Sequence, residues 1–246
     1  MNGLIYAIVF CYGIIMGSAA NALIDRLPKG KSWFKGRSEC DKCHHQLKFG
    51  DLIPVFSYLY LKGKCGYCHS PIPVRNLIVE IITGLAFIVI LGHSWSYSSL
   101  LLAGIAWVTV IIAFMDWETK LVSEAMVVIW GVLALLGNWG NLGNLGNWGG
   151  LLIGVGVIGG IWLVTRGRAM GEGDIEIAAV MGWWLGWANT PVALWLAFVL
   201  GSVVGVWKLA KKKSHLKDQI AFGPFLVLGS WIAYWWGEKI WAFIVK

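Results

Sequence analysis

Two aspartates stand at the ends of apolar segments, where their carboxyl groups could carry out acid–base chemistry. Asp174 follows two glycines in the stretch Met170-Gly171-Glu172-Gly173-Asp174 and precedes an apolar run, and Asp116 lies at the end of another apolar run. Insertion scales put the cost of a charge at the centre of a membrane helix at about 2.5–3.5 kcal/mol, so such residues are usually functional. Two neighbouring carboxyls cannot both ionise easily. One can then act as general base on a water molecule while the other polarises a scissile carbonyl.

The two glycines fit the same interpretation. Without side chains, Gly171 and Gly173 would let a substrate backbone approach and would let the chain turn into a helix that begins near Asp174. The N-terminus of that helix would favour the ionised form of this aspartate. The alternative is that each aspartate simply meets water at a helix end, with Asp174 acting as a helix cap. Other acidic residues nearby that could take a catalytic role are Glu118, Glu172 and Glu176.

Four of the five cysteines form two C-x2-C pairs within one short polar block. They are Cys40, Cys43, Cys65 and Cys68, with 21 residues (44–64) between the pairs. This pattern indicates a four-thiolate zinc site, although the spacing is slightly longer than usual. Zinc prefers four tetrahedral thiolates in structural sites, and it supplies folding energy that a small loop cannot gain by burial. A histidine ligand from His44 or His45 and four unliganded thiols are the alternatives, and Cys11 is expected to be a small apolar residue of the first segment.

The composition is that of a polytopic membrane protein. Of the 246 residues 58% are hydrophobic and 13% are charged, whereas a soluble domain has about 25% charged residues. The 17 tryptophans fit amphipathic anchoring at the two faces of a lipid bilayer. A net charge of +7 could indicate nucleic acid, but no basic stripe with interleaved aromatics lies outside the apolar segments. We therefore expect the bilayer, and not nucleic acid, as a partner.

Eight apolar segments recur along the chain, and the loops between them sort by charge. The segments lie at 3–23, 77–92, 99–115, 122–137, 150–165, 175–189, 191–207 and 221–237. Loops with Lys or Arg alternate strictly with loops that have neither; the former are 26–75, 116–121, 166–174 and 208–220, and the latter are 93–98, 138–149 and 190. The positive-inside rule then predicts about eight transmembrane helices with the first loop in the cytoplasm. Lys239 and Lys246 are exceptions, which a re-entrant or interfacial eighth segment would remove.

This topology places Asp116 and Asp174 at the same cytoplasmic face, which favours a catalytic pair over two isolated residues. The predicted fold is an all-α polytopic membrane protein with a small zinc-binding cytosolic domain inserted between helices 1 and 2. Its parts are a first transmembrane helix at 1–25, a zinc-binding domain at 26–75 and a transmembrane protease domain at 76–246. The first helix is expected to be a retained anchor, because no Lys or Arg precedes its apolar run as in a signal peptide.

Two further features have structural interpretations. Glu80, inside the second segment, is expected to be a buried hydrogen-bonding residue and not a catalytic one. Residues 137–149 repeat Asn-x-Gly; because Gly and Asn tolerate positive φ, we expect a chain of turns at the outer face, anchored by tryptophans.

A set of motifs spread over nearly the whole chain resembles a known family. The set comprises Gly17-Ser18 with Asn21, Arg26-Leu27-Pro28, the two cysteine pairs, Ile53-Pro54-Val55-Phe56-Ser57-Tyr58-Leu59, Glu80, Asp116, Gly171-Glu172-Gly173-Asp174 and Phe222-Gly223-Pro224-Phe225. Together these resemble the type IV prepilin leader peptidases, which are membrane aspartyl proteases of the GxGD type. One departure is that the family usually carries Ile-Pro or Leu-Pro shortly after the first aspartate, whereas residues 121–124 here read Leu-Val-Ser-Glu.

The resemblance implies that Asp116 and Asp174 are the catalytic aspartates of an endopeptidase. Its substrates would be prepilins or pseudopilins of type IV pilus and type II secretion systems, cleaved after a glycine at the cytoplasmic face of the bacterial inner membrane. Relatives with the cysteine-bearing domain typically also N-methylate the new N-terminal residue with S-adenosylmethionine. No strand followed by a glycine-rich loop marks a methyl-donor site in this sequence, so methylation follows from the resemblance alone.

Two other functions are alternatives. A proton-coupled transporter would place its carboxylates near the membrane midplane, whereas the predicted positions lie at one interface. A non-enzymatic pilus or secretion assembly protein would use the cysteine module for protein contacts, and it would tolerate asparagine at both aspartates.

Overall fold

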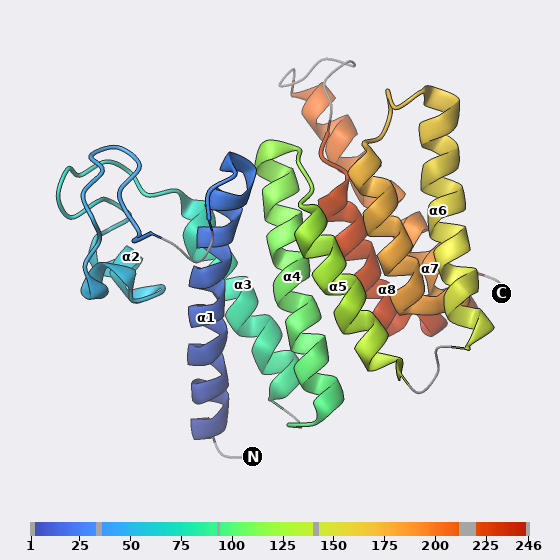
Figure 1. The fold of residues 1–246 in the computed structure, drawn as a ribbon, viewed down its shortest axis with the longest axis horizontal. Helices are drawn as coiled ribbons and strands as arrows, with labels where there is room; N and C mark the ends of the chain where they lie inside the picture. The colour runs from blue at the N-terminus through green and yellow to red at the C-terminus, as the bar shows by residue number, and fades with distance from the viewer. Residues whose placement is uncertain (1–2, 33–35, 93, 140–142, 212–219, 245–246) are drawn as a thin grey trace. The chain divides into compact units, whose positions relative to one another are not determined.

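The chain folds almost entirely into helices (Figure 1). A computed structural model of the chain describes residues 3–32, 36–92, 94–139, 143–211 and 220–244. The helices in order are α1 (Gly3–Arg26), η1 (Leu27–Lys29), η2 (Phe49–Leu52), α2 (Phe56–Tyr60), α3 (Val74–Leu91), α4 (Tyr97–Thr119), α5 (Glu124–Gly137), α6 (Leu145–Thr165), α7 (Glu172–Ala210) and α8 (Gly223–Ile244). Within the described ranges, β pairing is limited to two isolated bridges, Glu39–Gln46 and Lys64–Pro71.

The long helices coincide with the predicted apolar segments. Five stretches are long and apolar enough to cross a membrane: α1 together with η1, α3, α4, α6 and α7. Helix α5 is also apolar but has only 14 residues. The block between α1 and α3 holds only short helices and turns in its described part. The prediction of an all-helical polytopic membrane protein with a small cysteine-bearing insertion after the first helix is therefore confirmed.

Helix α7 contains two of the predicted segments, and the break between them differs from the expected one. The sequence predicts a loop at residue 190, beside Pro191, but residues 172–210 run as one element with a break at Gly186 (φ 73°, ψ 175°). Such a conformation is readily available only to glycine. The hydroxyl of Thr190 donates a 2.6 Å hydrogen bond to the Gly186 carbonyl and so satisfies an acceptor at the break.

The chain forms two compact units, Met1–Ile111 and Ile112–Lys246, with the unit boundary inside α4. In the first unit α1 and α3 pack through small residues. A Cβ atom on Gly13 would lie 2.7 Å from the Cα of Gly84, and one on Gly17 would lie 2.6 Å from the Cα of Glu80. Only glycine permits this approach, which brings the C-terminal part of α1 against the N-terminal half of α3.

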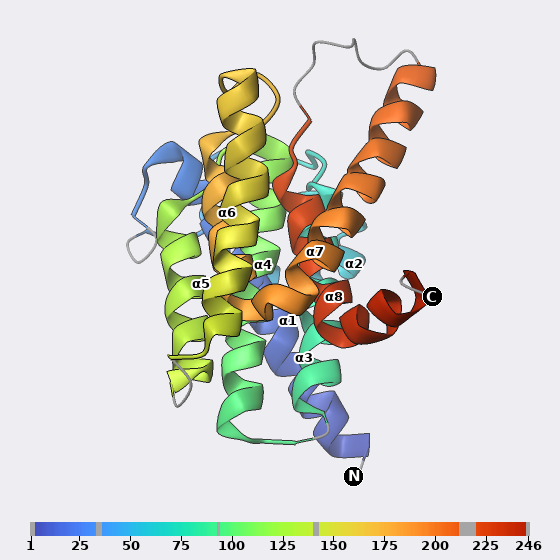
Figure 2. The same cartoon turned by 90° about the vertical axis from the view of Figure 1, so that its right-hand side faces the viewer.

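In the second unit α6 packs closely on α7 and α7 on α8 (Figure 2). A Cβ atom on Gly154 would collide with the carbonyl oxygen of Ala178, and one on Gly150 would collide with that of Gly182. Small residues four apart on one face are a common means of close helix packing in membranes, where no hydrophobic effect drives helices together. The core of this unit includes Trp130, Ile177 and Met181, which are fully buried.

Two expectations about the loops change. Residues 137–149 do not form turns throughout, because Leu145 to Gly149 begin α6, and the Asn144 side chain accepts a 2.9 Å hydrogen bond from the Gly146 N–H at its start. Residues 140–142, and with them part of the Asn-x-Gly repeat, lie outside the described residues, as do Lys212, Lys213 and Lys246.

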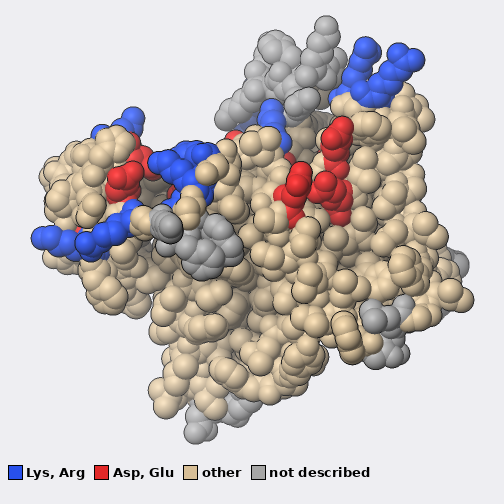
Figure 3. Space-filling view, in the orientation of Figure 1, with Lys and Arg blue, Asp and Glu red and all other residues tan. Residues whose placement is uncertain are grey.

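Within each unit, the charged side chains seen in Figure 3 gather toward one end, and the helical surface below them in that view carries none.

Candidate active site and thiol cluster

Asp116 lies in the last turn of α4 and is buried. Its side chain is 5% exposed, whereas Trp117, Glu118 and Thr119, which follow it, are exposed. Its Oδ2 accepts a 2.9 Å hydrogen bond from the backbone N–H of Gly223, the first residue of α8. The end of α4 therefore meets the start of α8 at this carboxylate.

Asp174 lies in the first turn of α7 and is 7% exposed. Its Oδ2 accepts a 3.0 Å hydrogen bond from the Gly171 N–H. Asp174 therefore caps the start of α7, as the alternative to a catalytic role predicts. The residue is nevertheless buried. A third residue links the two elements: a Cβ on Gly223 would lie 2.7 Å from Asp116 Oδ2 and 3.2 Å from Cδ1 of Ile177, one turn after Asp174.

The structure thus brings the two predicted aspartates together where α4, α7 and α8 converge in the second unit. Each carboxylate accepts one backbone hydrogen bond through Oδ2, and within the described chain no further donor reaches either side chain. The remaining oxygens are available to a water molecule and to a substrate carbonyl. Two buried carboxyls that come within hydrogen-bond reach of each other can share a proton, which is the requirement for acid–base hydrolysis by a carboxyl pair.

The neighbouring acidic residues differ from this pair in their surroundings. Glu118, Glu172 and Glu176 are all exposed. Burial therefore separates the two aspartates from the three glutamates.

The glycines before Asp174 have different local roles. A Cβ on Gly173 would lie 2.7 Å from both Cβ and Cγ2 of Val122, so glycine there lets the α4–α5 connection pack on the start of α7. Gly171 has only an ordinary contact, 3.7 Å from Asp174 Oδ2. Neither glycine has a positive φ; the sharp turn before α7 uses Arg166 (φ 53°) and Gly167 (φ 72°) instead.

The turn after Asp116 forms without a proline. Lys120 takes a positive φ of 56°, and its N–H donates a 2.8 Å hydrogen bond to the Asp116 carbonyl, which ends α4. Ser123 then serves as the N-cap residue of α5. The left-handed residue thus redirects the chain after Asp116.

The four predicted cysteines form a cluster in the first unit. The sulfur atoms of Cys40, Cys43, Cys65 and Cys68 all lie within 4.8 Å of one another, and none is in a disulfide. The Cys40 and Cys68 sulfurs are 3.8 Å apart. Tetrahedral coordination with metal–sulfur bonds of about 2.3 Å requires sulfur–sulfur distances of roughly 3.8 Å. The donor set and its spacing therefore fit one tetrahedral metal ion, and no histidine belongs to the cluster.

The two cysteine pairs sit on turns that repeat the same backbone pattern. The N–H of Cys40 donates to the His45 carbonyl at 3.0 Å, and the N–H of Cys65 donates to the Ser70 carbonyl at 2.8 Å. Four residues after each of these cysteines a histidine takes a positive φ, 55° at His44 and 57° at His69. These histidines therefore shape the turns, which orient the sulfurs toward a common point.

Backbone hydrogen bonds also set the acidity of the cluster. The N–H groups of Cys43 and Lys42 point at the Cys40 sulfur and lower its pKa to about 6. The His45 N–H acts to lower the pKa of Cys43, but desolvation and the neighbouring Cys68 and Cys40 thiols outweigh it and raise that pKa to about 11. The cluster thus combines a thiolate with a thiol at neutral pH, and a bound metal ion would displace the remaining protons.

Two other features were not predicted from the sequence. One is the contact of Gly223 with Asp116, whose signal in the sequence is the Gly-Pro pair of the Phe222-Gly223-Pro224-Phe225 motif in an apolar run. Glu80 is buried and hydrogen-bonded as expected, with its Oε2 accepting a 2.7 Å hydrogen bond from the Val55 N–H. The pocket that Glu80 lines, however, had no sequence signal.

A buried carboxyl pair at helix ends in a polytopic helical membrane protein, together with a thiol cluster suited to a metal, has the groups that a membrane-embedded hydrolase requires. The model of the Bacterial Peptidase A24 N-terminal domain matches residues 11–94, and that of the Type IV leader peptidase family matches residues 102–206. The chain belongs to the type IV leader peptidase family and is an enzyme of the peptidase class.

Curated proteins that are similar to this chain carry the name prepilin leader peptidase/N-methyltransferase. The protein from Aeromonas salmonicida is 31% identical over 273 residues, which cover 96% of this chain and 92% of the relative. The proteins from Pseudomonas putida and Neisseria gonorrhoeae are 30% and 28% identical, over 94% and 93% of this chain and 90% of each relative. No solved structure matches the chain.

Proposed function

We propose that the chain is a membrane aspartic endopeptidase whose catalytic residues are Asp116 and Asp174. The burial of both carboxyls at one place in the second unit, while the neighbouring glutamates are exposed, is the observation that supports this pair most directly. One carboxylate activates a water molecule as general base, and the other, protonated, polarises the scissile carbonyl. Gly171, where a Cβ would meet only Asp174 Oδ2 at 3.7 Å, leaves room for the substrate backbone beside Asp174, and Gly173 lets the loop around Val122 pack against the start of α7.

The proposed substrates follow from the names of the relatives. They are prepilins or pseudopilins, from which the enzyme removes a short basic leader. Both aspartates and the cysteine-bearing segment lie on the cytoplasmic side of the bacterial inner membrane in this proposal, as the alternation of charged loops indicates. The first transmembrane helix spans 1–25, the cytosolic domain 26–75 and the protease domain 76–246.

Two cofactors complete the proposal. Zinc, held by Cys40, Cys43, Cys65 and Cys68, has a structural role: it fixes a segment that has few buried apolar side chains of its own. S-adenosylmethionine supplies the methyl group for N-methylation of the new N-terminal residue, an activity that the name of the relatives implies.

Mass spectrometry of a co-expressed prepilin tests the catalytic pair. Wild-type enzyme should remove the leader, whereas Asp116→Asn and Asp174→Asn should each leave the precursor intact, because loss of a general acid or base costs about 10²–10⁴-fold in rate. The matched control is Glu176→Gln, which removes an exposed carboxylate two residues after Asp174 and should still cleave. Methylation adds about 14 Da to the mature N-terminus, since one hydrogen is replaced by a methyl group.

Cleavage by both asparagine variants would refute the aspartic mechanism and would direct attention to Glu118 and Glu172. A wild-type enzyme that cleaves no prepilin would instead favour one of the alternatives. An assembly phenotype that survives in both asparagine variants would favour the assembly protein, and a transport phenotype that is lost in them would favour the proton-coupled transporter.

A further inference from the structure

Five apolar side chains are exposed on the segment that runs through η2 and α2, in the block between α1 and α3. They are Phe49, Ile53, Phe56, Leu59 and Tyr60, and the exposed fractions of Phe49 and Tyr60 reach 85% and 87%. We call these five residues the η2–α2 face. Single exposed apolar residues are ordinary on a protein surface, whereas a group of them marks a site of interaction with a protein or a membrane. Covering these side chains would stabilise the block, so a partner is expected to lie on them.

Helix α2 turns its apolar side outward and its other side inward. Phe56, Leu59 and Tyr60 stand at positions i, i+3 and i+4 of the helix, so they share one side of it. Ser57 and Tyr58, on the other side, line a pocket of about 450 Å³. A helix at the surface of a soluble domain has these two sides the other way round, with the polar one outside.

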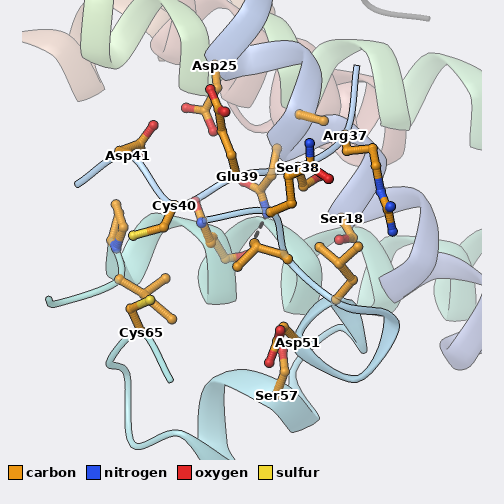
Figure 4. A pocket seen from close by; sticks show the side chains of 18 of the residues that line it. Ser18, Asp25, Arg37, Ser38, Glu39, Cys40, Asp41, Asp51, Ser57 and Cys65 are labelled. Carbon is orange, nitrogen blue, oxygen red and sulfur yellow. Dashed lines mark hydrogen bonds between the residues drawn. The ribbon is translucent and has the colours of Figure 1, made fainter. Parts of the chain in front are cut away.

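The pocket behind α2 is lined mainly by polar side chains. Figure 4 shows Asp51 and Ser57 on one side of it and Asp41 on the opposite side. Its wall includes Asn21 of α1, whose buried Oδ1 receives no hydrogen bond from the residues that the structure describes and so is an orphan acceptor. The polar groups of this block are thus gathered inside, and the η2–α2 face forms an apolar outer surface.

A hydrogen bond to α3 fixes the depth of the η2–α2 face. Val55 immediately precedes α2, and its N–H donates a 2.7 Å hydrogen bond to Glu80 Oε2. Helix α3 is apolar enough to cross a membrane, and its 18 residues extend about 27 Å at about 1.5 Å per residue. The hydrocarbon core of a bilayer is about 30 Å thick, so Val74 at the start of α3 must lie at its boundary. Glu80 comes six residues later and therefore lies about 9 Å further in.

The position of α2 in the first unit agrees with this depth. In Figure 1, α2 lies level with the upper half of α1, below the end at which α1 stops. Val55 has a φ of 64°, which β-branched residues rarely adopt, and the bond to Glu80 holds it there. The start of α2 is therefore held beside the outer part of the acyl chains and not in the water beyond them.

Three lysines flank the face. Lys48 stands before it, Lys62 and Lys64 stand after it, and all three are exposed. Asp51 is the only acidic residue of 48–64, and its carboxylate already accepts hydrogen bonds from the Lys48 N–H at 2.9 Å and the Tyr67 hydroxyl at 3.0 Å. Lysines beside a buried apolar surface extend their ammonium groups toward water and the headgroups. The charge of this stretch thus matches the phosphate layer of a membrane.

We propose that the η2–α2 face is an interfacial membrane anchor. It inserts its apolar side chains among the acyl chains of the leaflet at which α1 ends and α3 begins, with the three flanking lysines at the level of the headgroup phosphates. Interfacial helices bury their apolar side about 5–10 Å into the boundary between headgroups and acyl chains, and the depth that Glu80 sets lies in this range. The cysteine-bearing block is then attached to the bilayer at a third point, besides α1 and α3. This inference goes beyond the proposed function and does not depend on the catalytic pair.

Photolabelling of wild-type enzyme tests the anchor without any substitution. Full-length enzyme is reconstituted in phospholipid nanodiscs that contain a phosphatidylcholine with a diazirine in the outer part of its acyl chain. After irradiation, trypsin releases the face as peptide 49–62, because Lys48 and Lys62 are its cleavage sites. This peptide should carry lipid adducts, as should the peptide with α3, which is the positive control. Peptide 38–42, which contains Asp41 on the opposite side of the pocket, should carry none.

Two results of this experiment would overturn the anchor. One is an unlabelled peptide 49–62 beside a labelled α3 peptide. The other is equal labelling of 49–62 and 38–42, because the contact would then not be particular to the face.

A double variant tests whether the named side chains make the contact. Phe56→Ser/Tyr60→Ser should lower the labelling of 49–62 at least threefold relative to the α3 peptide. The matched control Trp95→Ser/Tyr97→Ser removes two exposed aromatic side chains near the other end of α3 and should leave this labelling unchanged. A monodisperse elution profile shows that each variant is folded, and the wild-type experiment decides the case if one is not. Unchanged labelling in the folded Phe56→Ser/Tyr60→Ser enzyme would refute the anchor.

A photoreactive side chain on the face identifies what covers it. Tyr60→p-benzoylphenylalanine enzyme is irradiated in nanodiscs with and without added prepilin, and its adducts are mapped by mass spectrometry. Phospholipid adducts support the anchor. Adducts confined to the prepilin, to residues 112–244 or to a second copy of the chain would show that a protein surface covers the face, and would contradict the anchor.

Discussion

The backbone N–H of Gly223 donates a 2.9 Å hydrogen bond to Oδ2 of Asp116, a residue 107 positions earlier in the chain. The bond holds one carboxylate of the proposed catalytic pair by a group that cannot rotate away. It also explains why the residue is glycine, since a Cβ there would lie 2.7 Å from the same oxygen. In the proposed mechanism Gly223 is therefore a positioning residue, which would act on the reaction through Asp116.

Gly223→Ala should lower kcat for leader removal by roughly 100-fold, because displacing a catalytic group by about 1 Å can cost this much. The KM should change little, since the substituted residue lies behind the carboxylate. The matched control is Gly156→Ala in α6, where a Cβ would meet nothing within 4 Å. Steady-state kinetics on a purified prepilin give both constants. Equal kcat in the Gly223→Ala and control enzymes would show that the hydrogen bond does not position Asp116.

Gly173→Ala should impair cleavage for a different reason, namely its collision with Val122. Because Cβ and Cγ2 of Val122 are both 2.7 Å from the added methyl group, Val122→Ala would not relieve the contact, whereas Val122→Gly would. The double variant Gly173→Ala/Val122→Gly should therefore recover most of the lost kcat/KM. A double-mutant cycle measures this coupling. Additive losses in the cycle would mean that Gly173 contacts the substrate and not only Val122.

The thiol cluster should hold one metal ion per chain. Elemental analysis of purified enzyme should find about one zinc per chain, lost in Cys65→Ser and retained in Cys11→Ser, because Cys11 lies in α1 away from the four sulfurs. Protons compete for the thiolates, so the metal affinity should fall as the pH is lowered.

Removing the metal should also destabilise the enzyme. Chelation, or serine at all four cysteines, should lower the thermal unfolding midpoint and the folded yield, because the metal supplies folding free energy to the segment between α1 and α3. A metal-free four-serine variant with full activity and an unchanged midpoint would contradict a structural role.

The packing of α6 on α7 should be sensitive to a single methyl group. Gly154→Ala places a Cβ against the Ala178 carbonyl, and overpacking of this kind typically costs about 1–3 kcal/mol. Its thermal unfolding midpoint in detergent should fall relative to that of Gly160→Ala, a control on the same helix with open space around the added Cβ. Equal midpoints would show that the two helices can move apart at no cost.

Much of this architecture could be predicted from the sequence because membrane helices are apolar throughout and the polar residues mark their ends. The ends of the apolar runs predict that Asp116 and Asp174 lie at helix ends, and the cysteine spacing predicts the thiol cluster. Both kinds of signal are local in the chain. They need no knowledge of which helix packs against which.

The features that depend on packing between distant helices could not be predicted. The contact of Gly223 with Asp116 requires α8 to meet the end of α4, and no local pattern specifies that pairing. Because proline disrupts helix interiors, the sequence predicts the break in α7 beside Pro191. The break occurs instead at Gly186, whose positive φ redirects the chain. The orphan acceptor of Asn21 becomes visible only once α1 lies on α3.

Helix α5 begins at Glu124, a short connection beyond Asp116, and has 14 residues. At about 1.5 Å per residue it extends about 21 Å, whereas the hydrocarbon core of a bilayer is about 30 Å thick. Lipids next to a short helix thin or draw back to match it. The bilayer should therefore be dimpled next to the carboxyl pair, and the dimple would let bulk water reach a peptide bond that acyl chains would otherwise cover.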